Sequence, residues 1–546
     1  MGKAAGCGSR SERGSRWKTC SAHWSTQIPP RRFGRPGHSN FRIAGNVMTS
    51  SINTLADVPE FAAAAFSTSA AITDGRVDHT FADIAAMCDL VSDSLVTMGV
   101  GKGDRVVLYG ENHAHWICCY YGILQLGAVV VPVNKLLRGH EVAFIADDCG
   151  AAAVIASPAM MPELANAFPE PVSLLPWSAF FDREAGSAGR VERPELAPDD
   201  IASVCYTSGT TGTPKGATLT HRNILTNALM TASMHGKLAS DVIYSALPCP
   251  HVYGNVVFQS AFLTGCKLYL NAAFDAGEAL AAIRTHGVTV FEGVPTMYFY
   301  LLNEDFAAAD CKTLRMLTVG GQTMPVAKME EVQRRFDAPL VELWGMTELA
   351  GLGTTHCALA GQVGNLPLGS IGTALPGVEA RVVSLDDPGK EAPSGEKGEL
   401  QVRGPIVMQG YWNNAAATRQ TIDDLGWLAT GDIATKDASG HVRIVDRKKD
   451  MILTAGYNIY PAELEARLSE HPDVAMVAVA SEADDEKGEI PVAHVVLRPK
   501  SDLGEEALRE HCRARLAAYK VPRKFVFADD LPKTSSGKIM RRALRK

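Results

Sequence analysis

The alternation of apolar and polar positions predicts a chain in which helices and strands follow one another. Between Phe81 and Met98 apolar residues recur at three- and four-residue spacing, Thr80 and Asp83 form a capping-box pattern before them, and Gly99 follows the last turn. Further helices are predicted at 325–336, 461–472 and 505–519. Short apolar runs, typical of buried strands, occur at 105–112, 128–134, 314–324 and 339–348. This alternation predicts an α/β fold.

The pattern changes twice toward the C-terminus, and 546 residues are too many for a single core. From about Leu368, short alternating strands are separated by Gly and Pro, which predicts a small β-barrel or antiparallel sheet. Beyond the stretch DRKKD at 446–450, helix-like and strand-like segments alternate over about 100 residues, which predicts a compact α+β domain. We therefore expect a domain boundary near DRKKD.

The first 47 residues differ in charge from the rest. They contain nine Lys or Arg and one acidic residue, Glu12, without apolar periodicity and without the central apolar stretch of a secretory signal. We predict that residues 1–47 are a disordered, dispensable extension, one explanation being translation from upstream of a true start at Met48. Enrichment in Arg and Ser also fits a transit peptide, although the scattered Gly and Pro argue against an amphipathic targeting helix. The remainder has 44 basic and 59 acidic residues, about −15, which argues against nucleic-acid binding.

Neither the cysteines nor the longest apolar segment indicates a secreted or membrane-spanning protein. The 12 cysteines form no Cys-x-x-Cys pair and show no zinc-like spacing with His, which favours a reducing, cytoplasmic setting. Residues 116–133 are the one candidate span, but Gln125 and two glycines interrupt it and Pro132 ends it. We predict a buried helix followed by a buried strand there, and peripheral membrane contact is left open.

The segment YTSGTTGTPKGATLTHR, at 206–222, is rich in glycine and hydroxyl side chains. Main-chain N–H groups that converge in so flexible a loop, together with hydroxyls and a lysine, suit a polyphosphate. The segment fails the P-loop template, because Pro214 rather than Gly precedes Lys215. A polar linker is the alternative, but the loop lies between the strand-like run IASVCY and a helix that Thr220 can cap. We therefore predict a loop for a nucleotide polyphosphate between that strand and that helix.

Four stretches carry a resemblance to a known family, and they occur in the order YTSGTTGTPKG, LWGMTE, GWLATGDIATKDASGHVRIVDRKKD and LPKTSSGKIMRR. Together they resemble the adenylate-forming superfamily of acyl-CoA synthetases, adenylation domains and luciferases, over about Thr54 to Lys546. The resemblance implies a large N-terminal domain of layered α/β sheets plus a small β-barrel at 48–446, a hinge at 447–449, and a small mobile α+β domain at 450–546. It also implies two steps. A carboxylate attacks the α-phosphate of ATP to give acyl-AMP and pyrophosphate, and a thiol then displaces AMP.

The resemblance assigns nucleotide contacts to particular residues. The phosphate loop would comprise Thr207, Ser208, Gly209, Thr210, Thr211, Gly212 and Lys215. Thr347 would bind phosphate and Glu348 a Mg²⁺ ion, a hard cation that takes oxygen ligands. The adenine-side loop would include Gly320 and Gly321, with Trp344 beside the ring, and Gly345 would also bind ATP or AMP. Asp432 would accept both ribose hydroxyls, and Arg447 would also touch the ribose.

The remaining assignments concern the mobile domain. Lys538 would reach the α-phosphate during adenylation, where a flexible ammonium can stabilise developing charge and then withdraw. The loop at Gly456, 82 residues earlier, would serve the CoA thiol. The family mechanism implies that a swing about Lys449 brings these two faces to the active site in turn.

Substrate signals are weaker. The stretch PCPHVYGN resembles the family segment that lines the acyl pocket, which assigns His251, Tyr253 and Gly254 to the substrate. Between Leu238 and Asp310 the only Lys and Arg are Lys267 and Arg284, so no clamp for a second carboxylate is visible. We expect a monocarboxylic acid with an apolar tail, fatty or aromatic. Leu453 and Ala455 stand where aryl ligases and luciferases of the family often carry lysines, which weakens a plant-type cinnamate-ligase interpretation.

The leading hypothesis is a stand-alone acyl-CoA ligase that uses ATP, Mg²⁺ and CoA. An acyl-AMP ligase that loads a separate carrier protein is the rival within the enzyme class, and a luciferase-like oxidation would begin with the same adenylation. A silent AMP or acyl sensor is disfavoured because Glu348, Asp432 and Lys538 are all present with the loop. The expected partners are the carboxylic acid, ATP and CoA, and not nucleic acid; the sequence does not predict an oligomeric state.

Overall fold

The computed structural model describes residues 52–168, 172–182, 192–207, 214–358, 366–484, 486–534 and 537–545. The predicted extension at 1–47, the start at Met48 and the loop residues Ser208 to Gly212 lie outside these residues.

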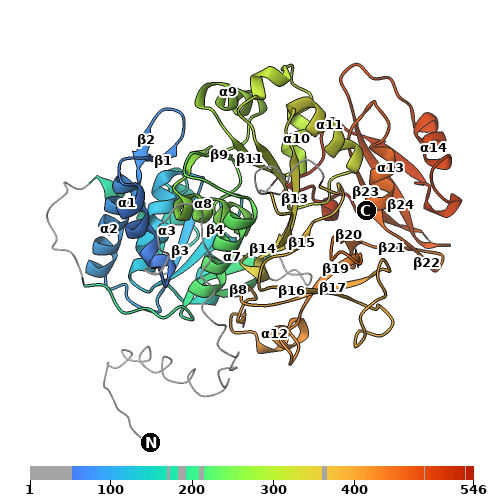
Figure 1. Ribbon diagram of the computed structural model, residues 1–546. Helices are drawn as coiled ribbons and strands as arrows, with labels where there is room; N and C mark the ends of the chain where they lie inside the picture. Colours follow the sequence, from blue (N-terminus) through green and yellow to red (C-terminus); the bar gives the residue numbers. More distant parts are fainter. Residues whose placement is uncertain are drawn as a thin grey trace, which may run out of the picture. The chain divides into compact units, whose positions relative to one another are not determined.

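One large sheet has nine strands in the order β15-β14-β13-β12-β11-β9-β10-β1-β2 (Figure 1). The strands are β1 (Ala70–Thr73), β2 (Asp78–Thr80), β9 (Val242–Ser245), β10 (Lys267–Leu270), β11 (Val290–Gly293), β12 (Met316–Val319), β13 (Leu340–Met346), β14 (Gly351–Thr355) and β15 (Thr373–Ala374). Pairing is parallel from β1 to β13 along this order and antiparallel at both edges.

A second large sheet has seven strands in the order β18-β8-β7-β4-β3-β5-β6. They are β3 (Arg105–Gly110), β4 (Val129–Asn134), β5 (Ala151–Ala156), β6 (Ser173–Pro176), β7 (Ile201–Thr207), β8 (Lys215–Thr220) and β18 (Gly410–Tyr411). Side chains that alternate along β3 enter two different cores, because Val106 and Leu108 join the largest hydrophobic cluster whereas Val107 and Tyr109 join a second one. Both faces of this sheet are therefore covered, as expected for a mainly parallel sheet.

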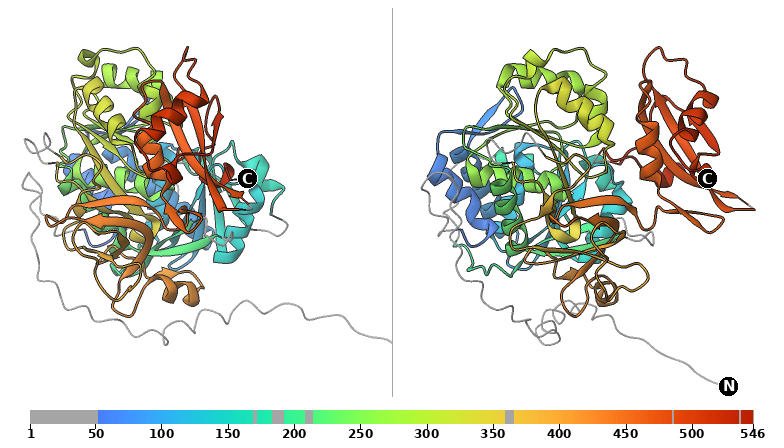
Figure 2. Two further views of the ribbon diagram at one scale, coloured as in Figure 1. Left: turned by 90° about the vertical axis from the view of Figure 1, so that its right-hand side faces the viewer. Right: turned by 45° about the vertical axis from the view of Figure 1, so that its right-hand side comes forward.

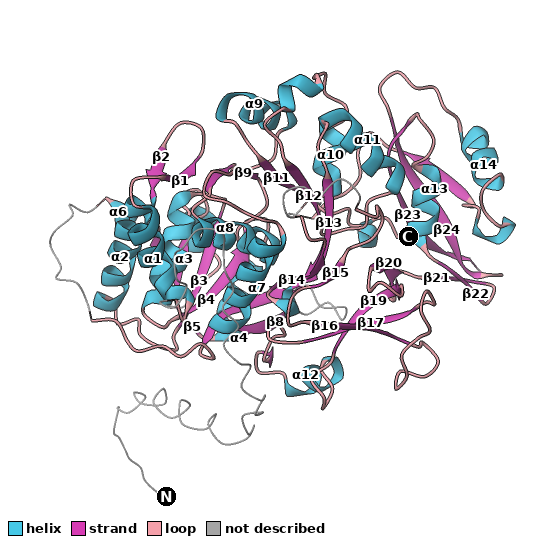
Figure 3. Ribbon diagram, viewed as in Figure 1, coloured by secondary structure: helices cyan, strands magenta, loops and turns pink. Residues whose placement is uncertain are grey.

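Helices fill the space between and around these sheets (Figure 3). They are α1 (Val58–Phe66), α2 (Phe81–Thr97), α3 (Ala114–Gln125), α4 (Gly139–Cys149), α5 (Met161–Ala165), α6 (Ser178–Phe181), α7 (His221–Met234), α8 (Val252–Thr264), α9 (Ala276–His286), α10 (Pro295–Leu301), α11 (Val326–Phe336) and α12 (Ala415–Thr421). Helices α3 and α7 contact the seven-stranded sheet, α8 contacts the nine-stranded sheet, and α7 packs on α8. The largest cluster joins residues of both sheets through these helices, which makes them the middle layer of the large domain.

Two predictions from local pattern are confirmed. Thr80 and Thr220 cap α2 and α7, and each side chain accepts a hydrogen bond from the main-chain N–H three residues later. The apolar segment at 116–133 forms most of α3 and β4, both buried. In the described part of the chain, no helix is long and apolar enough to cross a membrane.

The predicted order of strand, glycine-rich loop and helix lacks one strand. Strand β8 lies between the loop and α7 and pairs antiparallel with β7, so the loop connects the two strands of a hairpin rather than a strand and a helix. The pattern of β8, KGATLT, is too short and too rich in Gly and Thr to be recognised without its partner strand.

Two smaller sheets follow toward the C-terminus. A four-stranded antiparallel sheet, in the order β16-β17-β19-β20, comprises β16 (Glu379–Val383), β17 (Gly398–Arg403), β19 (Leu428–Lys436) and β20 (Val442–Arg447). The pattern allowed a barrel or an antiparallel sheet, and the described residues form an open antiparallel sheet, because its outer strands β16 and β20 do not pair with each other.

The last hundred residues form their own layer of strands and helices, orange to red in Figure 2. The elements are β21 (Ile452–Thr454), β22 (Tyr457–Ile459), α13 (Pro461–Leu468), β23 (Val474–Asp484), β24 (Gly488–Leu497), α14 (Glu505–Arg513) and β25 (Lys524–Phe527). Most of their buried apolar side chains form a cluster of their own, whereas five others join the largest cluster of the large domain, namely Ala475, Met476, Ala478, Val496 and Leu531. The fold is thus a large mixed α/β domain with a smaller C-terminal domain.

Candidate active site

The glycine-rich loop is closed at its base by the hairpin of β7 and β8. Thr207 and Lys215 are register partners, and the Thr207 hydroxyl donates to the Lys215 carbonyl at 3.4 Å. The Lys215 ammonium lies 5.4 Å from the ring centroid of Tyr411, which is on the neighbouring strand β18. Two of the predicted loop residues, Thr207 and Lys215, therefore lie near the edge of the seven-stranded sheet. The tyrosine beside Lys215 was not predicted from the sequence.

The same tyrosine contacts the predicted magnesium ligand. Glu348 follows β13 in a short 3₁₀ turn, Thr347–Leu349, and is buried. Its Oε1 accepts a hydrogen bond from the Tyr411 hydroxyl at 2.8 Å, and burial together with the negative charge of Glu348 raises the pKa of that hydroxyl. Tyr411 therefore contacts both Lys215 and Glu348, and it lies 63 residues after Glu348 in the sequence. Its only sequence signal is a tyrosine after Gly410, which is too common to indicate a site.

The chemistry of Glu348 fits a magnesium ion. A carboxylate supplies the oxygen donor that this ion prefers, and Mg²⁺ in nucleotide sites is commonly held by one or two carboxylates, substrate phosphates and water. Among the described residues no cluster of three or more His, Cys, Asp and Glu could hold a metal by itself. A metal at Glu348 would therefore depend on oxygens from the nucleotide.

Three residues predicted to bind the nucleoside lie together. Asp432 on β19 is the register partner of Arg447 on β20, and the Arg447 guanidinium Nε lies 3.0 Å from Asp432 Oδ1. The Trp344 indole N–H donates to Asp432 Oδ2 at 2.8 Å. Asp432 is 2% exposed, so one oxygen accepts from the indole and the other pairs with the guanidinium in a nearly dry setting. A carboxylate oxygen can accept a second hydrogen bond, which leaves Asp432 able to receive hydroxyl donors as well.

The three glycines predicted to bind the nucleotide are required for different structural reasons. A Cβ at Gly320 would stand 2.1 Å from Leu343 Cδ1, and one at Gly345 would stand 2.0 Å from the Gly351 carbonyl oxygen. These two are required where β12, β13 and β14 pack closely. Gly321 has a φ of +87°, and a Cβ there would stand 2.7 Å from Lys538 Cε. Gly321 alone of the three therefore faces the C-terminal lysine.

Lys538 lies against the large domain, where its charge is partly desolvated. Burial and the positive charge of Arg447 lower its pKa to about 8, while Asp432 acts in the opposite direction. Its Nζ is 3.4 Å from His251 Nε2. The structure thus brings together Lys538, Gly321 and His251, with Arg447 and Asp432 close enough to influence the ammonium.

The protonation state of His251 determines which groups can donate hydrogen bonds near Lys538. His251 caps α8, and its Nδ1 accepts from the Tyr253 N–H at 3.2 Å. Burial and the nearby Lys538 lower the pKa of the imidazole to about 3, so the ring is neutral at pH 7. Because Nδ1 is the acceptor, the single ring proton is on Nε2. Two donors, Nε2–H and the ammonium, therefore converge on one place, an arrangement suited to an oxygen anion.

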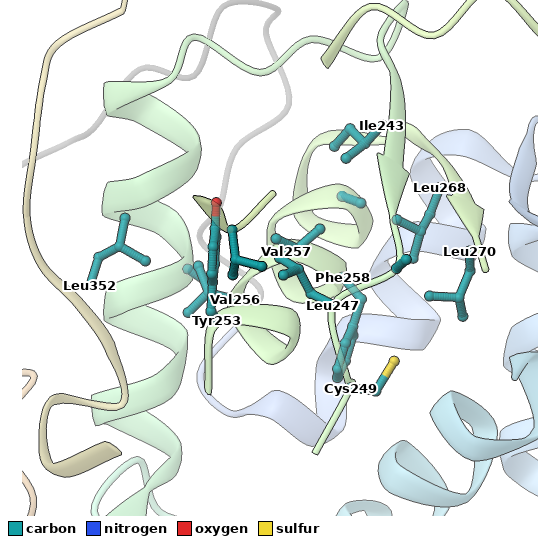
Figure 4. Packing of buried hydrophobic residues seen from close by; sticks show 14 of the residues in the cluster. Ile243, Leu247, Cys249, Tyr253, Val256, Val257, Phe258, Leu268, Leu270 and Leu352 are labelled. Carbon is teal, nitrogen blue, oxygen red and sulfur yellow. The ribbon is translucent and has the colours of Figure 1, made fainter. Parts of the chain in front are cut away.

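Tyr253 and Gly254 lie in densely packed surroundings. The Tyr253 hydroxyl is 3.2 Å from Glu292 Oε2 and 2.6 Å from Thr318 Oγ1, and Figure 4 shows its ring beside Val256. A Cβ at Gly254 would stand 2.3 Å from the Pro248 carbonyl oxygen, so packing of α8 alone requires a glycine. Their assignment to the acyl pocket stays a prediction.

A buried lysine near this region was not predicted from the sequence. Lys237 Nζ lies 2.8 Å from Glu292 Oε1 and 2.8 Å from Ser260 Oγ, and both charged side chains are buried. It stands one residue before the window searched for basic side chains. Because Glu292 neutralises it, Lys237 does not provide the missing clamp for a second carboxylate.

The predicted hinge and CoA residues lie on other parts of the C-terminal domain. Ala455 (φ +48°) and Gly456 (φ +83°) form the two-residue turn between β21 and β22, and no described atom lies within 4 Å of where a Gly456 Cβ would stand. Burial and the charge of Arg447 lower the pKa of Lys449, whose carbonyl accepts from Arg545 at 3.3 Å. Lys538, and not Gly456, is the residue that this arrangement brings to Gly321.

Comparison with known proteins identifies both domains. The family model described as "AMP-binding enzyme" matches residues 60–412, and "AMP-binding enzyme C-terminal domain" matches residues 463–538. The chain is 36% identical over 494 residues to a long-chain-fatty-acid–CoA ligase of Escherichia coli O6:H1, covering 82% of this chain and 86% of that protein. It is 32% identical over 487 residues to an indoleacetate–CoA ligase of Aromatoleum aromaticum, covering 86% and 93%.

A solved structure gives the same result for the fold. The o-succinylbenzoate coenzyme A synthetase of Bacillus subtilis, in complex with ATP and magnesium ion, superposes with a TM-score of 0.78 at 30% identity. The match covers 89% of this chain and 99% of that one.

Proposed function

Because the chain belongs to the AMP-binding enzyme family, we propose that it is an ATP-dependent acid–thiol ligase, which converts a monocarboxylic acid to its acyl-CoA through acyl-AMP. The observation that carries this proposal is the convergence of the Lys538 ammonium and His251 Nε2–H, 3.4 Å apart, beside Gly321. Two donors directed at one place suit the oxygen anions that must meet when a carboxylate attacks a phosphate.

The residues divide the first step between them. Asp432, held by Trp344 and Arg447, accepts from the ribose hydroxyls and so fixes the nucleoside. Lys538 neutralises charge on the α-phosphate as the acid oxygen approaches in line, and His251 donates to an oxygen of the same centre. Buried surroundings strengthen these interactions, because little water competes for the donors. The products of this step are acyl-AMP and pyrophosphate.

Lys215 and Glu348 serve the leaving group. The loop between Thr207 and Lys215 holds the β- and γ-phosphates, with the lysine supplying positive charge. Glu348, oriented by the Tyr411 hydroxyl, would hold a magnesium ion, which supplies charge neutralisation on the phosphate oxygens when bound. In the second step the CoA thiol attacks the acyl carbon of acyl-AMP, the acyl–phosphate bond breaks, and AMP leaves.

The substrate that we propose is a fatty or aromatic monocarboxylic acid. Two of the three relatives named above are ligases of long-chain fatty acids and of indoleacetate, both apolar acids with one carboxylate. The surroundings of α8 are mainly apolar, and Glu292 already neutralises the buried Lys237. We also propose a reducing, cytoplasmic location, because all ten cysteines in the described part of the chain are free thiols.

One assay tests the proposal. Pyrophosphate release is measured with ATP, magnesium and a panel of fatty and aryl acids, with and without CoA, and the products are identified by mass spectrometry. We expect acyl-AMP without CoA and the acyl-CoA thioester with it. Thioester formed only on a separate carrier protein would replace CoA ligation with carrier loading. Absence of pyrophosphate release with every acid, while ATP or AMP still binds, would indicate a sensor.

A further inference from the structure

The C-terminal segment that carries Lys538 is held by two side chains of the large domain. The Thr296 hydroxyl, in the first turn of α10, donates to the Gly537 carbonyl at 2.7 Å. The Gln322 amide bonds Ile539 in both directions, because its Nε2 donates to the Ile539 carbonyl at 3.0 Å and its Oε1 accepts from the Ile539 N–H at 2.8 Å. Three hydrogen bonds therefore fix the main chain on both sides of Lys538.

The segment itself has the shape that these contacts need. The Thr534 N–H donates to the Lys538 carbonyl at 2.7 Å, and the Lys538 N–H donates to Thr534 Oγ1 at 3.1 Å. Lys533 and Ile539 form an isolated antiparallel bridge. Gly537 has a φ of +77°, a conformation that glycine adopts at little cost. The main chain on either side of Lys538 is thus held by local bonds and presented to the large domain as one unit.

Close approach at both ends leaves little freedom for the lysine. A Cβ at Gly537 would stand 3.1 Å from Val294 Cγ2 and 3.2 Å from Thr296 Oγ1. On the other side, Gly321, which directly precedes Gln322, leaves the space that Lys538 Cε occupies. Val294 and Thr296 lie at the start of α10, directly after β11, and Gly321 lies directly after β12. Because β11 and β12 are neighbours in the sheet, the surface that contacts the Lys538 segment is formed where these two strands end.

We propose that Thr296 and Gln322 are positioning residues, which dock the Gly537–Ile539 main chain and thereby direct the Lys538 side chain into the nucleotide site. This inference rests on the proposed function, in which Lys538 acts during adenylation. Neither residue needs to touch ATP or the acid. Their contribution is to the fraction of molecules in which Lys538 is in place, so they affect the first step and not the thiol step.

Polar contacts suit this role better than apolar ones. A hydrogen bond between neutral groups contributes little net free energy, because water replaces it when the partners separate. Docking by such bonds is directional, since each donor must meet one acceptor, and it is reversible within a catalytic cycle. A large apolar contact would hold the segment at higher cost of release.

The test uses near-isosteric variants of the full-length protein. Gln322→Met removes both hydrogen-bonding groups at similar length, and Thr296→Val removes the hydroxyl at similar volume. Gln409→Met and Thr313→Val are matched controls, because Gln409 Nε2 and Thr313 Oγ1 each donate to a main-chain carbonyl elsewhere in the large domain. Thr296→Ser retains the donor and should restore activity.

Two half-reactions and one exchange measurement are followed. We expect kcat for pyrophosphate release from acid and ATP to fall roughly 5- to 30-fold in Gln322→Met and roughly 5-fold in Thr296→Val. Each neutral hydrogen bond that is lost should lower the rate by a factor of about five, and Gln322 makes two such bonds. Thioester formation from supplied acyl-AMP and CoA should stay within about twofold, because this step does not need Lys538. Amide hydrogen exchange in peptides covering 537–545 should become faster in both variants and stay unchanged in both controls.

The outcomes are distinguishable. Unchanged adenylation and unchanged exchange in both variants would overturn the proposal, and so would an equal loss of both half-reactions accompanied by a lower Tm, since that indicates a structural role. If the wild-type protein releases no pyrophosphate with any acid, the proposed function fails. The exchange measurement then still decides whether Gln322 and Thr296 hold the Lys538 segment.

Discussion

Lys538 and Gly456 belong to the same small domain, yet their surroundings differ in every respect. The segment around Lys538 meets the large domain through Gly321, Thr296 and Gln322. The turn at Gly456 is exposed, and the Ala455 N–H donates to the Lys487 carbonyl of its own domain at 2.8 Å. Leu453 and Tyr457, on either side of that turn, are 51% and 57% exposed. One face of the domain is engaged and the other is presented to solvent.

This difference explains how one small domain could serve two steps. Large apolar side chains at the exposed turn are costly to leave in water, which is understandable if a later arrangement covers them. The engaged face is held by hydrogen bonds and ion pairs, which water can replace when they break, and by a few apolar side chains such as Met476 and Val496. We propose that the domain presents its two faces alternately, as the family resemblance implies.

Polar contacts join the predicted hinge to the C-terminal domain. Asp446, the residue before 447–449, accepts from the Ala462 N–H at 2.8 Å and lies 3.7 Å from the Arg541 guanidinium. Burial raises the pKa of Asp446 to about 6 although Arg541 acts in the opposite direction. Desolvation therefore outweighs the attraction of Arg541 at this carboxylate.

The largest expected effect is that of removing the ammonium on the engaged face. Lys538→Ala should lower the rate of pyrophosphate release about 10²- to 10³-fold, because a charge contact to the transition state is lost. The rate is measured with acid, ATP and magnesium in the absence of CoA. Lys524→Ala is the control, since Lys524 is an exposed lysine of the same domain that pairs with Glu482. A loss of less than tenfold would contradict the assignment of Lys538.

A bulky side chain on the exposed face should lower the rate of the thiol step. Gly456→Leu should lower thioester formation from supplied acyl-AMP and CoA by up to about 10²-fold, because a side chain at the turn crowds the approach of the thiol. Gly395→Leu is a matched control, with a φ of +84° and likewise no neighbour within 4 Å of its Cβ position. Equal losses in both variants would mean that backbone strain and not position is responsible.

A smaller effect is expected where the two domains touch. Gly321→Ala should lower pyrophosphate release roughly tenfold, since the new methyl group displaces the flexible end of Lys538 and a positive φ costs Ala about 1–2 kcal/mol. Gly103→Ala carries the same strain at φ +85° without a neighbour within 4 Å of its Cβ position. If Gly103→Ala loses as much activity as Gly321→Ala, the contact with Lys538 is irrelevant.

The smallest effect is a pH dependence confined to one step. Because the pKa of Lys538 is about 8, its ammonium is lost as pH rises through this value, and kcat/KM for ATP in pyrophosphate release should fall roughly threefold between pH 7.5 and 8.5. Thioester formation from supplied acyl-AMP should lack this decline. The same decline in the residual activity of Lys538→Ala would assign it to another group.

Local features of the fold could be predicted from the sequence because their causes are local. The Thr80 cap depends on a partner three residues away, so the pattern shows it. Strand β8 was not predicted, because its partners β7 and β18 define it and β18 is almost 200 residues away. The site shows the same limit. The resemblance named Lys538 and Gly321 separately, whereas the Gln322–Ile539 pair and the Tyr411–Glu348 bond join residues whose meeting no spacing reveals.

The most direct test of the two-face account compares both half-reactions in two variants, Lys538→Ala and Gly456→Leu, with one acid and its prepared acyl-AMP. For each enzyme the rate of pyrophosphate release is divided by the rate of thioester formation from acyl-AMP and CoA. The account predicts that this ratio falls in Lys538→Ala and rises in Gly456→Leu, each by at least about tenfold relative to wild type. Equal loss of both steps in both variants, with unchanged ratios, would contradict it.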